Sequence, residues 1–85
     1  MELIDNVLIS LGYDVNDEDI KQKVGILIEA VKEYLTDGGA PETIGNKKTE
    51  ITCISIGVND LLNCTSGEVK FSPAFYIFAN QICRR

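Results

Sequence analysis

The sequence predicts an all-α fold, a small bundle of about four helices within one domain that spans residues 1–85. Apolar residues recur at three- and four-residue steps through most of the chain, which is the pattern of amphipathic helices. Clusters of glycine, proline, asparagine and serine separate these segments. The length of 85 residues allows one domain only. A domain of this size buries only about 60–65% of its unfolded surface, so assembly with other chains would add to its stability.

The first helix is predicted from Glu2 to Leu11 and ends at Gly12, since glycine tolerates the left-handed conformation that stops a helix. Its apolar stripe consists of Ile4, Val7, Leu8 and Leu11.

A longer second helix is predicted to begin after Asn16 or Asp17, either of which can cap its first turn, and to reach Leu35. Lysines four residues after acids predict the helix-stabilising pairs Asp17–Lys21 and Asp19–Lys23. Gly25, beside the apolar stripe, either permits a close approach of another helix or is incidental. The stripe consists of Ile20, Val24, Leu27, Ile28, Val31 and Leu35.

The stretch from Thr36 to Lys48 has no periodicity and is dense in turn-forming residues. A connection this long in so small a domain is often functional, which makes it a candidate interaction loop; a plain linker is the alternative. The candidate residues are Asp37, Gly38, Gly39, Pro41, Gly45, Lys47 and Lys48.

The segment from Thr49 to Asn63 supports two interpretations, because its apolar residues fit a helical stripe while β-branched residues also alternate as in a strand. Gly57 weakens both. The length of the segment and the apolar pair Leu61–Leu62 favour a helix.

Residues 64–70 read as a turn, after which Ser72 can cap a last helix and Pro73 can occupy its first position. Aromatic residues of this helix, Phe75, Tyr76 and Phe78, are predicted to form core or subunit interface rather than a base-stacking surface. Arg84 and Arg85 end the helix at its negative pole and are a second candidate contact, toward an acidic partner.

Catalytic and metal-binding patterns are missing from the sequence, which contains no histidine and neither of the common glycine-rich phosphate loops. The acids Asp17, Glu18 and Asp19 face different directions on a helix and read as a solvated helix start. We therefore expect no enzyme activity, no metal and no cofactor. The three cysteines, Cys53, Cys64 and Cys83, read as reduced thiols.

The net charge of −5 argues against tight binding of nucleic acid, which depends on clustered lysine and arginine. The longest apolar runs fall short of the roughly 18 residues that span a bilayer. With no basic leader at the start of the sequence, the expectation is a protein of the cytoplasm without membrane contact.

Three stretches of the sequence resemble the small head–tail connector proteins of tailed phages, the gp6-like DNA-packaging (head completion) family. The first is the acidic helix start Tyr13–Ile20, and the second is the helix end Leu27–Leu35 with Ala30 and Tyr34 at the family's positions. The third is Phe71–Pro73, which leads into an apolar helix that ends in two arginines. The segment 36–48 and the start of the third helix depart from the family's pattern.

The resemblance implies a structural protein without catalytic activity that forms a homo-oligomeric ring on the portal protein. Such a ring extends the DNA channel, lets DNA pass without sequence-specific binding and docks the next connector or tail protein. It also implies a place in the host cytoplasm during assembly and at the head–tail interface of the virion.

Two other functions remain alternatives. An acyl-carrier-like protein would be small, acidic and helical, but Asp60 is followed by Leu61, and Ser66 by Gly67, where the carrier motif needs Asp-Ser-Leu. A small acidic adaptor or regulator that mimics DNA agrees with the net charge, although its acids are spread along the chain.

Overall fold

The computed structural model confirms the all-α fold: its described residues form four helices and no strand. It describes residues 3–40, 44–45, 47–63 and 71–83. The helices, in chain order, are α1 (Leu3–Leu11), α2 (Glu18–Asp37), α3 (Lys48–Leu62) and α4 (Pro73–Cys83). The segment with two interpretations is therefore helical, as its length and the apolar pair at its end had favoured.

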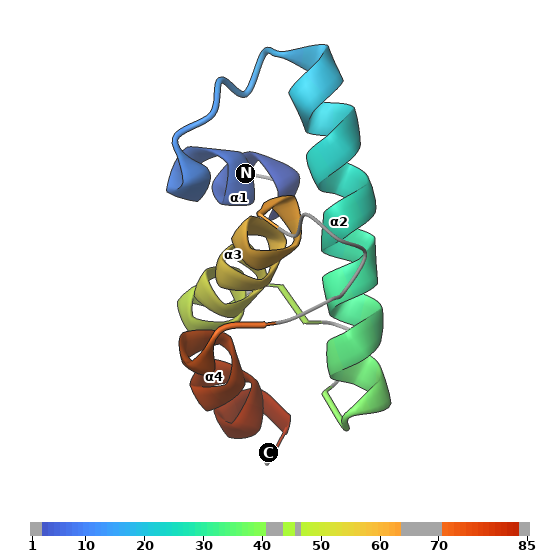
Figure 1. Cartoon of the computed structure of the whole chain (residues 1–85), viewed down its shortest axis with the longest axis vertical. Coiled ribbons are helices and arrows are strands. Elements are labelled where there is room, and N and C mark those ends of the chain that lie inside the picture. The colour runs from blue at the N-terminus through green and yellow to red at the C-terminus, as the bar shows by residue number, and fades with distance from the viewer. Residues whose placement is uncertain (1–2, 41–43, 46, 64–70, 84–85) are drawn as a thin grey trace.

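The helices form a thin slab in which α2 runs the length of one side, and α1, α3 and α4 follow one another along the other (Figure 1). Helices α2 and α3 each contact every other helix, whereas α1 and α4 do not contact each other. The Cα atoms extend over 35 × 33 × 18 Å. Because the short dimension is only about two helix diameters, the helices keep exposed faces.

Every helix contributes its predicted apolar stripe to one continuous core. The fully buried side chains come from all four helices and include Leu8 of α1, Leu35 of α2, Ile54 of α3 and Ile82 of α4. Burial of such apolar area, worth roughly 25 cal/mol per Å², is what holds the slab together.

Three helices approach one another closely at Gly57, in the middle of α3. A Cβ atom at this position would lie 2.7 Å from Cε1 of Phe75 in α4 and 3.0 Å from Cγ1 of Val31 in α2. Both neighbours are fully buried. The glycine that weakened the helical interpretation of this segment is thus the point at which three helices meet.

Gly25 of α2 does not have this role. A Cβ atom there would meet Cδ1 of Ile4 at 3.4 Å, which is close to ordinary van der Waals contact. The packing of α1 against α2 therefore does not depend on a glycine at this position.

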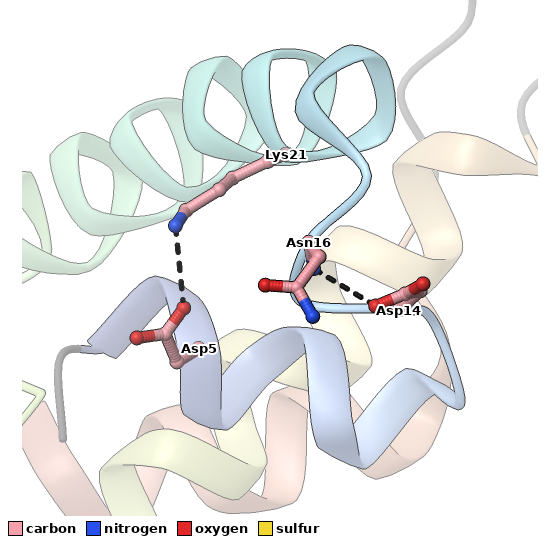
Figure 2. Close-up of polar contacts among 4 residues, drawn as sticks. All are labelled: Asp5, Asp14, Asn16 and Lys21. Atoms are coloured by element: carbon pink, nitrogen blue, oxygen red, sulfur yellow. Dashed lines mark hydrogen bonds and ion pairs between the residues drawn. The ribbon is translucent and has the colours of Figure 1, made fainter.

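The start of α2 is fixed by acidic side chains. Asp17 is the N-cap, and its Oδ1 accepts hydrogen bonds from the backbone N–H groups of Asp19 (3.1 Å) and Ile20 (3.3 Å). In the preceding turn, Oδ1 of Asp14 accepts from the N–H of Asn16 at 2.9 Å (Figure 2). These bonds decide between the two predicted caps.

The predicted pairs Asp17–Lys21 and Asp19–Lys23 are wrong. Nζ of Lys21 instead lies 3.5 Å from Oδ1 of Asp5 in α1, an ion pair that joins the two helices (Figure 2). This ion pair results from tertiary packing, because α1 lies against α2 and brings the Asp5 carboxylate within reach of Lys21. Asp17 acts instead as the N-cap of α2.

The connection between α2 and α3 is shorter than predicted at both ends. Helix α2 continues through Thr36 to Asp37, and Gly39, with φ of 110°, follows its last turn. Helix α3 already starts at Lys48, since the buried carboxylate of Glu50 accepts hydrogen bonds from the N–H groups of Lys47 (3.3 Å) and Gly45 (3.0 Å). A glutamate at this position of a helix is a common capping group.

The start of α4 follows the prediction. Oγ of Ser72 accepts a hydrogen bond from the N–H of Phe75 at 3.4 Å, and Pro73 is the first helical residue. In addition, Oδ2 of Asp60 in α3 accepts from the N–H of Ser72 at 2.9 Å. This bond ties the first turn of α4 to the end of α3.

We expect Gly57→Ala to destabilise the protein, by up to about 2 kcal/mol. The gain in helix propensity of about 1 kcal/mol is outweighed by overpacking against two fully buried side chains, which costs about 1–3 kcal/mol. The matched control is Gly25→Ala, which meets no such obstacle and should stabilise by about 0.5–1 kcal/mol. Urea unfolding of both variants checks this, and a Gly57→Ala variant as stable as Gly25→Ala would contradict it.

Candidate interaction site

The two ends of the candidate interaction loop lie on different parts of the molecule. Gly39 packs beside the end of α4, where its Cβ position lies 3.5 Å from the carbonyl oxygen of Cys83. Gly45 packs beside α1, where its Cβ position lies 2.9 Å from Cδ2 of Leu3. The loop residues predicted from sequence therefore divide between two surfaces. Pro41, Arg84 and Arg85 lie outside the described residues.

The first surface is a groove between the last turns of α2 and the outer side of α4, and we call it the acidic groove. It encloses about 480 Å³. Among the described residues that line it, Asp37 is the charged one. The lining residues are Tyr34, Leu35, Asp37, Gly38, Tyr76, Ala79, Asn80 and Cys83.

Two lining residues of the acidic groove, Tyr34 and Tyr76, belong to an aromatic cluster with Phe71 and Phe75, which do not line the groove. Phe71 and Phe75 stack with their centroids 4.1 Å apart, and Tyr34 lies 5.1 Å from Phe71. Tyr76 meets Phe75 edge-on at 5.9 Å. Tyr34 and Tyr76 remain 46% and 44% exposed, so the cluster is buried on one side and open to solvent on the other. The predicted role in the core holds for Phe75, whereas Tyr76 faces the groove.

The Tyr34 hydroxyl keeps its proton at neutral pH. The pKa of Tyr34 is raised above 10.0 because partial burial disfavours the phenolate, and because Tyr76 lies beside it and shares a hydrogen bond with it. The protonated Tyr34 hydroxyl can donate and accept hydrogen bonds, and the negative charge among the described lining residues belongs to Asp37.

The ends of two helices add to this negative potential. Helices α2 and α4 both end at the lower edge of the view in Figure 1, and Sγ of Cys83 lies 3.4 Å from the Cβ position of Gly38. The carboxyl end of a helix carries a partial negative charge that basic residues usually offset. Neither last turn contains a basic residue, and that of α2 contains Asp37. Among the described residues, no basic side chain offsets this negative charge; Arg84 and Arg85, which follow Cys83 in the sequence, lie outside them.

The second surface lies where α1 crosses the start of α3, and we call it the basic corner. It is a shallow hollow of about 280 Å³ beside the exposed Lys47 and Lys48. Ile9, at 54% exposed, is its main apolar residue. The lining residues are Asn6, Ile9, Ser10, Lys48, Ile51 and Thr52.

Two of the three cysteines are described, and both are free thiols. Burial raises the pKa of Cys53 to about 12, with a smaller contribution from Cys83, so its thiol stays protonated and unreactive. Cys83 is half-buried, and its Sγ donates a weak hydrogen bond to the carbonyl oxygen of Leu35 at 3.6 Å. Cys64 lies outside the described residues.

A third hollow, of about 480 Å³, lies between the end of α1, α3 and the start of α4 and is rich in hydroxyl groups. Two of its polar side chains are bonded within the fold: Oγ of Ser55 donates to the carbonyl oxygen of Ile51 at 2.8 Å, and Oδ2 of Asp60 accepts from the N–H of Ser72. The described residues contain no buried side-chain polar atom without a partner. This hollow is thus explained by the packing of α4 on α3.

Within the described ranges, no group of three or more histidine, cysteine, aspartate or glutamate side chains comes together as a metal site. No described helix combines the length and apolar character that crossing a bilayer requires.

The sequence pointed to Asp37 and Gly38 as interaction residues and to Tyr76 as core or subunit interface, but it gave Tyr34 no place at an interaction surface. Tyr34 precedes Leu35, and Tyr76 follows Phe75, so each flanks a core residue at the edge of an apolar stripe. Two tyrosines at stripe edges are a usable signal for a half-buried aromatic surface, since their rings pack while their hydroxyls reach water.

We expect Cys83 to react with a thiol reagent in the folded protein, while Cys53 reacts only when the protein unfolds. Two double variants, Cys64→Ser/Cys83→Ser and Cys64→Ser/Cys53→Ser, leave one described thiol each. Labelling with an aromatic disulfide reagent at pH 8 should be slow for the first and faster for the second. Equal rates in native buffer would contradict the burial of Cys53.

Comparison of the chain with known proteins gives no assignment: no protein-family model, curated protein or solved structure matches it.

Proposed function

We propose that this chain is a structural subunit of the head–tail connector of a tailed phage or prophage. It assembles as a ring on the portal protein, extends the DNA channel and docks the next connector or tail protein. The observation that carries the proposal is the presence of two separate surfaces, each of which combines exposed apolar side chains with charge.

A subunit of a closed ring needs two different surfaces, because each copy contacts one neighbour on either side in a head-to-tail arrangement. The acidic groove is built by α2 and α4, and the basic corner by α1 and α3. Since α1 and α4 do not contact each other, the two surfaces do not overlap. This separation fits a ring subunit better than a simple two-fold dimer, which uses one surface twice.

Other exposed apolar side chains are available for the portal and the tail-side protein. Ile26 on α2 is 70% exposed and Ile77 on α4 is 59% exposed. Large apolar side chains at this exposure often mark interaction surfaces when they lie together with further apolar area. An adaptor between two other proteins requires such surfaces in addition to the contacts between its own copies.

The charge of the chain suits a conduit for DNA. The net charge is −5, and exposed carboxylates follow the outer side of α2 at Glu18, Glu29 and Glu33. A wall of negative potential repels the phosphates of DNA and lets the duplex pass without being held. In this proposal the chain does not bind DNA in a sequence-specific manner.

The thin shape supports assembly as well. A slab about two helices deep leaves each helix partly exposed, and contact between copies would bury part of that surface. Binding to the folded state stabilises a protein in proportion to the logarithm of partner concentration. A ring would thus stabilise a domain whose own core is small.

The test needs a portal protein from the phage or prophage genome that carries this chain. Purified portal and chain are mixed, and sedimentation together with electron microscopy measures whether a ring of added mass forms on the portal. We expect a ring in register with the portal subunits. The portal alone is the control, and failure of the chain to sediment with it would contradict the proposal.

A parallel measurement separates the acyl-carrier alternative. The chain is incubated with a phosphopantetheinyl transferase and coenzyme A and then weighed by mass spectrometry. We expect the mass to stay unchanged, and addition of a prosthetic arm would reject the connector proposal.

A further inference from the structure

We infer, on the basis of the proposed assembly of copies into a ring, that the acidic groove of one copy binds the basic corner of the next. The partner of the groove is thus a second copy of this chain, which presents Lys48 and Ile9. Four properties of the described residues carry this inference: the placement of charge on the helix ends, the lack of partners within the chain, the fit of apolar parts, and the position of the two surfaces.

On both surfaces, the charged side chains have the same sign as the partial charge of the helix end at which they lie. Asp37 lies in the last turn of α2, where the helix already carries partial negative charge, and Lys47 and Lys48 lie at the start of α3, where it carries partial positive charge. Each placement costs stability in the single chain. Contact between the two surfaces would offset both costs, because each helix end then faces the opposite charge.

These charged groups have no ionic partner among the described residues of the same chain. The ion pair recorded there joins Lys21 to Asp5, on a different part of the fold. Asp37, Lys47 and Lys48 are all exposed to solvent. They are therefore free to pair with a neighbouring molecule.

The apolar parts of the two surfaces are complementary. The acidic groove has an aromatic base formed by Tyr34 and Tyr76, and its volume of about 480 Å³ is ample for a branched aliphatic side chain. The basic corner presents Ile9, at 54% exposed, beside Lys48. An isoleucine can lie against the rings while the lysine reaches Asp37, and the tyrosine hydroxyls and Asn80 remain available for hydrogen bonds.

The arrangement of the surfaces makes the contact head-to-tail. One surface belongs to α2 and α4, the other to α1 and α3, and neither is complementary to itself in charge. Repetition of one such contact generates a ring when its rotation closes. This deepens the proposed function by naming the surfaces through which copies meet.

Two charge reversals test the contact, Asp37→Lys in the groove and Lys48→Glu in the corner. In each variant the new charge is opposite in sign to the partial charge of its helix end. Neither variant should therefore be less stable than the parent. We measure association by sedimentation velocity at millimolar concentration and low salt. The parent chain should self-associate, and each variant alone should associate about tenfold or more weakly, because like charges then face each other.

An equimolar mixture of the two variants should recover association close to that of the parent. In the mixture every junction again joins opposite charges, the reversed groove to the reversed corner and the native groove to the native corner. Matched controls are Glu29→Lys and Lys23→Glu, which change the net charge equally on exposed positions of α2 outside both surfaces. These controls should associate as the parent does.

The arginines after α4 supply a second set of cations and are tested directly. The double variant Arg84→Gln/Arg85→Gln should associate as the parent does. If it fails to associate, the arginines rather than Lys48 supply the positive charge of the contact, and the inference is overturned. A parent chain that stays monomeric at millimolar concentration, or variants whose mixture does not recover, would also overturn the inference. The connector proposal would still be tested separately by the portal experiment, because that experiment does not depend on these residues.

Discussion

The fold depends on the close approach of three helices at Gly57. Only a residue without a side chain lets α3 pass between Val31 of α2 and the ring of Phe75 of α4 at the observed separation. The position of Phe75 sets the aromatic cluster, and the cluster in turn supports Tyr34 and Tyr76 at the acidic groove. A packing constraint in the centre of the slab therefore determines the shape of a surface at its edge.

Much of the fold followed from the sequence, because helical periodicity and capping are local signals. The stripe from Ile20 to Leu35, the cap at Asp17 and the Ser72–Pro73 start of α4 are each encoded within a few residues. The interpretation of residues 49–63 was less certain, since β-branched residues favour strands unless tertiary packing overrides them. Helix α3 contacts all three other helices, and this packing outweighs the strand propensity of its β-branched residues.

The features that the sequence could not predict are contacts between distant segments. Lys21 pairs with Asp5 rather than Asp17 because α1 packs against α2, and residue spacing within one helix does not encode that packing. For the same reason, a single turn-rich stretch gave no sign that Asp37 and Lys48 would belong to separate surfaces. Glu50, as the buried cap of α3, was likewise hidden among ordinary charged residues.

The lack of contact between α1 and α4 has a consequence for how the molecule opens. Among the described helices, each terminal helix contacts only α2 and α3, so α4 can detach while α1 stays in place, and the reverse. Local unfolding commonly proceeds in such separable units, each with its own free energy. Amide hydrogen exchange should accordingly fall into two independent classes at the ends of the chain around a slower α2–α3 centre, and a neighbour bound at one end would protect that end alone.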